Sequence, residues 1–477
     1  MGPRLRILGV THVLPDRDRA AAYSPRPLPD DGLVELSFMD AQFVDRAMPM
    51  RRLFFYEGPG VPPFPRLARA LRCSLAAALA VFPPLSGKLV HRPSAGDVVV
   101  DCSPAAASSP GVRFVEAEYD GGIGDMRRVA GGSDEGDREA LVELGPELDA
   151  SELPAPVLAV QVTRPAVGGD GSAVVVGVAV HHAVADGHSV WQFMKVWAAL
   201  SRMEVSQQSE TVADLVAPPS FDRTPLRYPE AEELAGKILS LIAPALPVIR
   251  SPSSCPPPPD RWRRTFLIHA DEIQSVKQHI RAHSQTTGEQ PGTLPSTYLA
   301  VSSLVWTSVA RAKSRDLAGG DAYFLVAADY RRRLGPPIDE RYFGDCVVPC
   351  VARAAARDLR DGGGDGLARA AAAIRDAIRA QPECPVRAME AWLEALRTVP
   401  RERFTFTGSS NRFMAYETDF GWGAPSRVEL VSLFATELVL LLGAEGGGVQ
   451  VTATLCPEHM EAFASNLLRF ASGGNEE

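Results

Sequence analysis

Two adjacent histidines, His181 and His182, follow an uncharged stretch of small and β-branched residues at 173–180. This composition is typical of a strand buried on both faces, where apolar and polar residues no longer alternate. Beyond the histidines, apolar residues recur at the spacing of one helix face: Val190, Phe193, Met194, Trp197 and Leu200. We therefore expect both histidines at the junction between a core strand and a helix, where rigid scaffolds often present catalytic groups.

The two histidines fit three kinds of role. A neutral imidazole, with an ordinary pKa of about 6.5, can accept a proton at neutral pH and act as a general base. Both rings can instead be structural, hydrogen-bonded to carbonyl groups, while Asp186 caps the following helix. Histidine and aspartate also bind metals, but no third ligand stands at a suitable spacing nearby, so we expect no metal site. The spacing alone leaves the catalytic and structural roles open.

The rest of the chain supplies the elements that must position these residues. Patterns of apolar residues predict strands at 5–14, 112–119, 156–165 and 173–180, helices at 65–82, 296–312 and 366–380, and a hairpin at 437–455. The stretch 121–150 is rich in Gly, Asp and Glu without a period, and we expect it to be irregular. Strands and helices alternate irregularly, which suits an α/β architecture with mixed sheets.

Three motifs along the chain resemble those of one enzyme family. HHAVADG at 181–187 resembles the active-site signature of acyl-CoA-dependent acyltransferases of chloramphenicol-acetyltransferase-like fold. DFGWG at 419–423 resembles the second signature of the plant BAHD acyltransferases, in the same order along the chain. YFGDC at 342–346 is similar to the YFGNC motif of the branch that acylates anthocyanin, flavonoid and other phenolic glucosides, with Asp345 in place of Asn. The resemblance covers essentially the whole chain.

The resemblance implies two chloramphenicol-acetyltransferase-like domains of α/β fold, with mixed β-sheets and a central active-site channel between them. The length of 477 residues also favours two domains. We expect an N-terminal domain at 1–200 carrying HHAVADG, an aperiodic crossover linker at 201–229, and a C-terminal domain at 230–477 carrying YFGDC and DFGWG.

The same resemblance assigns the general base to the second histidine, His182, and leaves the first one structural. It implies that Asp186 points away from the reacting centre and pairs with an arginine of the D-x-R-x-R turn, either Arg331 or Arg333. Gly187 would permit the tight turn after Asp186. No covalent enzyme intermediate and no permanently bound cofactor are implied, because acyl-CoA serves as a co-substrate.

The second signature is expected to be structural. Its glycines and tryptophan suit a backbone bend that packs between core segments, and the resemblance places it off the active centre: Asp419, Gly421, Trp422 and Gly423.

Other residues are candidates for binding the two substrates. For coenzyme A, the candidates lie at a predicted helix start and at the charged turn: Ser296, Thr297 and Asp329. For the acceptor, Phe38 and Asp40 lie in a segment similar to the family's LTFFD-like motif, and Arg412 stands shortly before DFGWG. Each also has an ordinary explanation as a core, capping or solvated residue.

The branch that these motifs resemble uses malonyl-CoA or hydroxycinnamoyl-CoA. His188 stands where the family often has Lys or Arg, which weakens the expectation of a malonyl donor, although malonyl remains favoured. The expected acceptor is a sugar hydroxyl of a flavonoid, anthocyanin or other phenolic glucoside. The alternatives are a hydroxycinnamoyl-CoA-specific transferase acting on another alcohol or amine, a peptide-synthetase condensation domain, and a non-catalytic ligand-binding paralogue.

Composition sets further expectations. The net charge of -9 argues against a nucleic-acid partner, which favours a basic surface. We expect no signal peptide and no membrane span, because no sufficiently long apolar run is present. Seven cysteines form no C-x-x-C pair and no zinc spacing, which favours reduced thiols. Together with the resemblance, this predicts a cytoplasmic monomer.

Overall fold

The computed structural model describes residues 4–20, 31–45, 49–131, 140–167, 173–206, 218–249, 262–284, 294–361, 365–431 and 437–471. The chain divides into two compact units, neither of them continuous in sequence. The first unit consists of Met1–Pro256, Pro336–Cys346 and Ala415–Phe434. The second consists of Pro257–Gly335, Val347–Met414 and Ala435–Glu477.

The first unit contains a six-stranded sheet in the order β1-β6-β8-β9-β3-β14. Its strands are β1 (Leu5–Val13), β3 (Pro49–Glu57), β6 (Val112–Tyr119), β8 (Leu158–Pro165), β9 (Ala173–His181) and β14 (Arg427–Val431). β6 and β8 run parallel, and the other neighbours are antiparallel, so the sheet is mixed. A four-stranded sheet has the order β2-β5-β4-β7, formed by β2 (Leu33–Glu35), β4 (Lys88–Arg92), β5 (Asp97–Asp101) and β7 (Ala155–Pro156).

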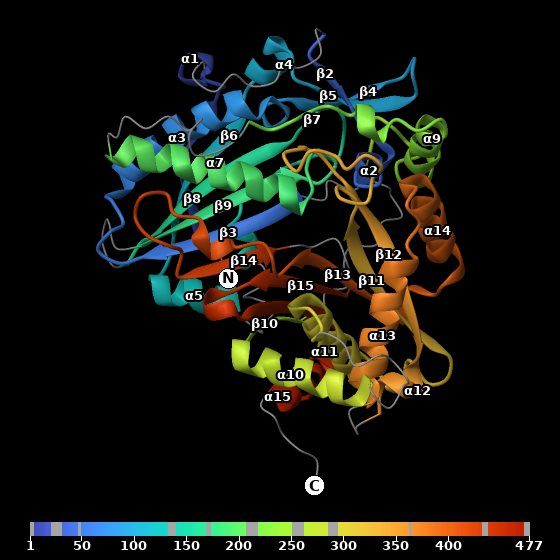
Figure 1. Ribbon diagram of the computed structural model, residues 1–477. Helices are drawn as coiled ribbons and strands as arrows, with labels where there is room; N and C mark the ends of the chain where they lie inside the picture. Colours follow the sequence, from blue (N-terminus) through green and yellow to red (C-terminus); the bar gives the residue numbers. More distant parts are fainter. Residues whose placement is uncertain are drawn as a thin grey trace. The chain divides into compact units, whose positions relative to one another are not determined.

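Two long helices of the first unit lie side by side on its large sheet (Figure 1). α3 (Phe64–Val81) packs against α7 (Gly187–Ser206), and the Trp197 Nε1–H donates to Leu71 O at 3.3 Å and Ser74 Oγ at 3.1 Å. The remaining helical segments are short or peripheral: α1 (Arg17–Ala20), α2 (Phe38–Ala41), η3 (Pro83–Leu85), α4 (Pro104–Ser108), α5 (Ile123–Gly131), η4 (Thr224–Leu226), α9 (Ala231–Ile242) and η7 (Ala415–Glu417).

The second unit is built on another mixed six-stranded sheet, in the order β10-β16-β15-β13-β11-β12. Its strands are β10 (Trp262–Ile268), β11 (Asp321–Asp329), β12 (Val347–Ala355), β13 (Phe404–Ser410), β15 (Leu438–Gly443) and β16 (Val449–Leu455). Its helices are α10 (Ala270–Ser284), α11 (Thr297–Ala312), α12 (Ala356–Leu359), α13 (Asp365–Ala380), α14 (Pro385–Thr398), η6 (Arg401–Arg403), η8 (Glu445–Gly447) and α15 (Pro457–Ala471). The β15–β16 pair forms the predicted hairpin.

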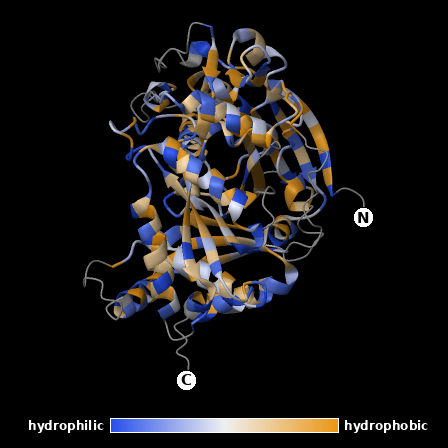
Figure 2. Cartoon of the chain, turned by 90° about the vertical axis from the view of Figure 1, so that its right-hand side faces the viewer, coloured by the Kyte–Doolittle hydropathy of each residue, from blue (hydrophilic) through white to orange (hydrophobic). Residues whose placement is uncertain are grey.

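The strands of both units are coloured mostly as hydrophobic residues, whereas many helices carry both hydrophobic and hydrophilic residues (Figure 2). The predicted α/β fold with mixed sheets is thus confirmed, while the channel expected between two domains stays a prediction. Among the described residues, no helix is long and apolar enough to cross a membrane.

The expected irregular stretch at 121–150 is partly wrong, because it contains α5. Met126, Val129 and Ala130 fall at i, i+3 and i+4 and are fully buried, so one apolar helix face packs against a core that includes Phe55 and Tyr119. The sequence did not predict this short amphipathic helix because polar residues surround its few apolar positions.

The units differ in extent from the predicted domains. The segments at 336–346 and 415–434 were expected in the C-terminal domain, but they group with the first unit. The physical reason for the second segment is strand pairing, because β14 extends the large sheet beside β3, with Val428 opposite Phe54. Within the expected linker at 201–229, the first residues continue α7 to Ser206, and residues 207–217 lie outside the described part of the chain.

Candidate active site

β9 ends at His181, so His181 and His182 both lie at the end of the first unit's large sheet. Every residue of β9 is buried, as its uncharged sequence predicts. His181 is the last strand residue, and its backbone N–H donates to Val157 O at 2.8 Å. Its Nδ1 accepts a hydrogen bond from Ala183 N at 3.2 Å, and burial lowers the pKa of His181 to about 3. A neutral, fully enclosed ring of this kind organises the turn that presents the next residue.

His182 lies beyond the strand, and 15% of its side chain remains exposed. Its ring stacks on Phe43, with centroids 3.6 Å apart and planes inclined by 15°. On one edge, His182 Nδ1 lies 3.2 Å from Asp345 Oδ1. The Nδ1 atom is buried, and this approach lies outside hydrogen-bonding geometry, so the ring and the carboxylate are in contact without a directed hydrogen bond.

The surroundings of His182 favour its neutral form. Burial lowers its pKa to about 4, and the positive charge of Arg52 acts in the same direction, while the negative charge of Asp186 opposes them. A ring with this pKa is uncharged at pH 7 and is available to accept a proton.

Arg52 is itself an unusual residue of this site. Its side chain comes from β3 and is only 4% exposed, and burial lowers its pKa to about 10. The guanidinium lies 5.9 Å from the ring centre of Trp191 and donates to Arg51 O. A buried cation therefore stands close enough to His182 to influence its titration.

Asp186 caps α7. Its Oδ1 accepts from Ser189 N at 2.9 Å, and its Oδ2 accepts from Cys346 N at 3.2 Å. The first bond is that of a helix N-cap, and Gly187 is the first residue of the helix. The second bond ties the histidine loop to the YFGDC segment, so Asp186 holds both loops in place.

The YFGDC segment makes further bonds to the start of α7. Gly344 O accepts from Ser189 Oγ at 3.0 Å, and Gly344 N donates back to the same oxygen at 3.1 Å. Glu340 O makes hydrogen bonds with His188 Nε2 at 2.9 Å and Gln192 Nε2 at 2.7 Å. These contacts fix the loop that carries Asp345.

A second anchor for Asp345 comes from Asp40, which is fully buried. Asp40 Oδ1 accepts from Asp345 N at 2.8 Å, and its Oδ2 accepts from Ser37 N and Ser37 Oγ at 2.8 and 2.7 Å. Arg223 Nε lies 3.5 Å from the same carboxylate, and its Nη1 donates to Phe343 O at 2.7 Å. Asp40 thus holds the YFGDC segment in place.

Gly344 is required by this packing. Its φ of +149° is rarely adopted by other residues, and a Cβ there would lie 2.6 Å from the Arg223 guanidinium.

The two acceptor-binding candidates of the N-terminal motif are both buried, since Phe38 is 1% exposed and Asp40 is 0% exposed. Their acceptor-binding role stays a prediction.

The DFGWG motif forms a compact turn in the first unit. Asp419 Oδ1 accepts from the backbone N–H groups of Gly421, Trp422 and Gly423 at 2.7, 3.1 and 2.9 Å. Both glycines have φ near +100°. Phe420 is fully buried against Tyr56, whose hydroxyl donates to Thr418 O at 2.7 Å. These contacts have the form of the structural bend expected from the sequence.

The remaining predicted residues lie in the second unit. Ser296 caps α11 by accepting from Leu299 N, and Thr297 is the first residue of that helix. Asp329 Oδ1 accepts from Arg331 N at 2.9 Å, and Arg333 Nη2 donates to Ile378 O at 3.0 Å. Arg412 is exposed, and its N–H donates to Ser410 Oγ. Their binding roles, and the pairing of Asp186 with Arg331 or Arg333, stay predictions.

Sequence reasoning missed three neighbours of His182: Phe43, Arg52 and Asp345. Asp345 left a signal, because it is the single departure from YFGNC, but its partner could not be read from the motif. Phe43 and Arg52 resembled ordinary apolar and surface positions.

A comparison with protein-family models agrees with the resemblance that the sequence motifs indicate. The model of the Transferase family matches residues 22–468. The chain belongs to this family, the BAHD acyltransferases. It is therefore an acyl-CoA-dependent acyltransferase.

Two relatives and one structure illustrate the similarity. The chain is 26% identical over 454 residues to the malonyl-coenzyme:anthocyanin 5-O-glucoside-6'''-O-malonyltransferase of Salvia splendens, covering 92% of both chains. It is 29% identical to phenolic glucoside malonyltransferase 1 of Bemisia tabaci, covering 89% of both. The crystal structure of vinorine synthase matches with a TM-score of 0.73 at 18% identity, over 98% of this chain and all of the other, which shows a shared fold.

Proposed function

We propose that this BAHD acyltransferase moves a malonyl group from coenzyme A to a sugar hydroxyl of a phenolic glucoside, such as a flavonoid or anthocyanin glucoside, with His182 as the general base. The observation that carries the mechanism is a partly exposed imidazole whose buried Nδ1 edge lies 3.2 Å from Asp345. Two malonyltransferases of anthocyanin and phenolic glucosides among the relatives support the choice of substrates.

The base acts through Nε2, on the side of the ring away from Asp345. The Asp345 charge favours a proton on Nδ1, which leaves Nε2 with a free lone pair. Nε2 takes the proton of the sugar hydroxyl while that oxygen attacks the thioester carbonyl. The tetrahedral oxyanion then collapses, the carbon–sulfur bond breaks, and the imidazolium returns the proton to the departing coenzyme A sulfur.

Asp345 stabilises the imidazolium that forms during attack. Burial makes that cation energetically costly, because burial lowers the pKa of His182. A carboxylate 3.2 Å from Nδ1 offsets part of this cost in the transition state. Phe43 holds the ring plane, and Asp40 and Asp186 hold the backbone that carries Asp345.

Arg52 supports a malonyl donor. The family position that often holds Lys or Arg is His188, whose ring is bonded to Glu340 O. Arg52 instead provides a positive field near His182, which favours an acyl group with a terminal carboxylate. Arg52→Gln should reduce kcat/KM for malonyl-CoA roughly 10–100-fold, the worth of about 1.5–3 kcal/mol for an interaction with a charged group, and should reduce kcat/KM for coumaroyl-CoA much less.

The test of the function is release of free thiol from malonyl-CoA and, separately, from coumaroyl-CoA, with an anthocyanidin 3-glucoside as acceptor. Acceptor-dependent release from malonyl-CoA is expected. Release from coumaroyl-CoA alone would replace the donor assignment. Release from neither, in a protein that still binds coenzyme A, would favour another acceptor or a non-catalytic role, and a panel of phenolic glucosides would separate these two.

A further inference from the structure

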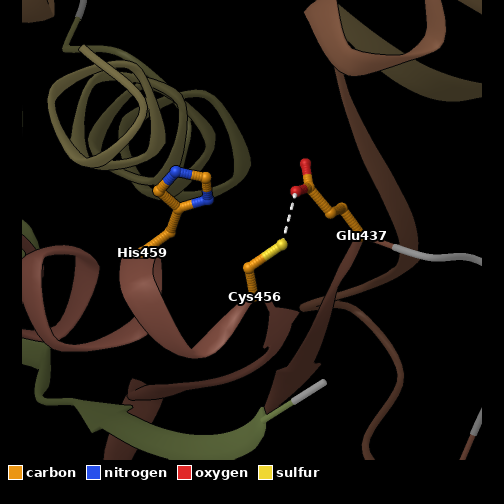
Figure 3. A group of neighbouring side chains, drawn as sticks. All are labelled: Glu437, Cys456 and His459. Carbon is orange, nitrogen blue, oxygen red and sulfur yellow. Dashed lines mark hydrogen bonds between the residues drawn. The ribbon is translucent and has the colours of Figure 1, made fainter. Parts of the chain in front are cut away.

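A cluster of three potential metal ligands lies in the second unit. Glu437 precedes β15, Cys456 joins β16 to α15, and His459 lies in the first turn of α15. One ligand atom from each side chain lies within 4.8 Å of the other two. Figure 3 shows the three side chains converging from the hairpin and from the start of the helix.

His459 is aimed into this cluster. The residue is 8% exposed, and its Nε2 lies 3.1 Å from Asp316 Oδ2. Its other nitrogen, Nδ1, is buried and has no hydrogen-bond partner among the described residues. The ring edge that carries this nitrogen faces Cys456 and Glu437 (Figure 3). A buried imidazole nitrogen without a partner is costly unless something binds it.

We propose that Glu437 Oε1, Cys456 Sγ and His459 Nδ1 bind a zinc ion, with a fourth position open to water. Thiolate, imidazole and carboxylate are the three side-chain ligands that zinc takes in tetrahedral sites. Bond lengths of about 2.0–2.3 Å place tetrahedral ligands about 3.5 Å apart. Cys456 Sγ and Glu437 Oε1 are 3.9 Å apart, so small side-chain rotations suffice.

The surroundings already orient the ligands. Asp316 on Nε2 leaves Nδ1 of His459 as the metal-binding nitrogen, the carboxylate–histidine–zinc arrangement common in zinc proteins. Lys313 Nζ donates to Glu437 Oε2 at 2.6 Å and to Glu402 O at 2.6 Å, which fixes the carboxylate and leaves Oε1 toward Cys456.

The charges also accommodate a divalent cation. The charges of the neighbouring side chains Lys313, Glu437 and Asp316 sum to about −1. Zinc adds two positive charges and displaces the thiol proton, so the cluster becomes neutral. The thiolate stands at the N-terminus of α15, whose dipole stabilises negative charge.

This site would be structural and separate from acyl transfer. β15 and β16 are paired up to Leu438 and Thr454, so the ion would join the open end of this hairpin to the first turn of α15. The inference departs from the sequence-based expectation of no metal site, because Glu437 is distant in sequence from the Cys-x-x-His pair.

The test is zinc content and affinity of the full-length protein after removal of loosely bound metal. A single zinc ion per chain is expected, and cobalt in its place should give a sulfur-to-cobalt charge-transfer band. Cys456→Ser should abolish that band and lower zinc affinity more than 100-fold, beyond the effect typical of residues around the ligands. Cys384→Ser, which alters a partly exposed thiol of the same unit, is the matched control and should retain both.

A further variant distinguishes a built site from adventitious binding to a thiol. Asp316→Asn leaves all three ligands in place and should weaken zinc binding roughly 10–100-fold. Zinc should also raise the thermal midpoint of the wild type and not that of Cys456→Ser. Absence of zinc and cobalt binding in the wild type, or an unchanged cobalt band in Cys456→Ser, would overturn the proposal.

Discussion

His182 and His459 have the same local chemistry and different surroundings. Each ring has one nitrogen beside a carboxylate, Nδ1 at 3.2 Å from Asp345 in the first case and Nε2 at 3.1 Å from Asp316 in the second. The His182 ring is partly exposed and stacks on Phe43. The second nitrogen of His459, in contrast, is buried and faces a thiol and a carboxylate. A histidine–carboxylate pair therefore does not define a base, because the environment of the second nitrogen decides its chemistry.

The two carboxylates differ as well. Asp345 is fully buried in a loop fixed by Asp40 and Asp186, whereas the Asp316 side chain is 44% exposed. A buried charge acts more strongly on its neighbour than an exposed one, because water screens it less. We therefore expect Asp345 to affect the transition state and Asp316 to orient a ligand.

The largest expected effect is the loss of the proposed base, His182. His182→Ala should lower kcat roughly 10²–10⁴-fold, the usual contribution of general acid–base catalysis, with coenzyme A affinity preserved. His459→Ala should leave kcat within a few-fold while lowering thermal stability. Steady-state thiol release and calorimetric binding of coenzyme A measure both. Full activity in His182→Ala would reverse the comparison, and the exposed His12→Ala serves as a neutral control.

Removal of the carboxylate charges separates the two pairs further. Asp345→Asn keeps the shape of the side chain and should lower kcat roughly 10–100-fold, the worth of about 1.5–3 kcal/mol for an interaction with a charged group. KM should change little, since the imidazolium exists only after attack begins. Asp316→Asn should leave kcat unchanged. Equal effects of the two variants on kcat would remove the distinction drawn between the carboxylates.

The loop that carries Asp345 should be sensitive to a single methyl group. Gly344→Ala places a Cβ 2.6 Å from the Arg223 guanidinium at φ +149°, and should cost about 1–3 kcal/mol of unfolding free energy and reduce kcat. Gly423→Ala is the matched control, since its φ is +100° with no atom within 4 Å of the added Cβ. Urea denaturation compares them, and equal losses would show that the contact with Arg223 does not matter.

The pH dependence of activity is expected to show a smaller effect. With the pKa of His182 lowered to about 4, kcat/KM should hold its plateau from pH 7 down to about 5 and fall only near pH 4. Asp345→Asn removes a negative charge and should move this limb to lower pH. A limb near 6.5 in the wild type would show that the ring is not desolvated in the free enzyme.

The lowered pKa values of the two histidines should also make the unfolding free energy depend on pH. His181 and His182 are neutral in the folded state below the ordinary histidine pKa, so the unfolded state binds more protons between about pH 4 and 6.5. Unfolding free energy should therefore fall as pH drops through this window, by about 1.4 kcal/mol per pH unit for each histidine. In His181→Asn, denaturation at several pH values should show a slope reduced by one such contribution.

The sequence predicted the strand, loop and helix around His182 because their apolar residues follow clear local periods. It also marked Asp345 as a departure from a motif. The sequence did not predict the contact between Asp345 and His182, because this contact depends on bonds from Asp40 and Asp186 to the backbone of a distant loop. β14 was missed for a similar reason, since five residues give little signal before they pair with β3.

The discontinuity of the first unit has a consequence for biosynthesis. β3 is made early, but its partner β14 leaves the ribosome only after most of the second unit has been synthesised. At roughly 5–20 residues per second, the β3 edge stays without this neighbour for tens of seconds. An uncovered apolar strand is a template for association between nascent chains, so efficient production of this protein should depend on chaperones that shield that edge during translation.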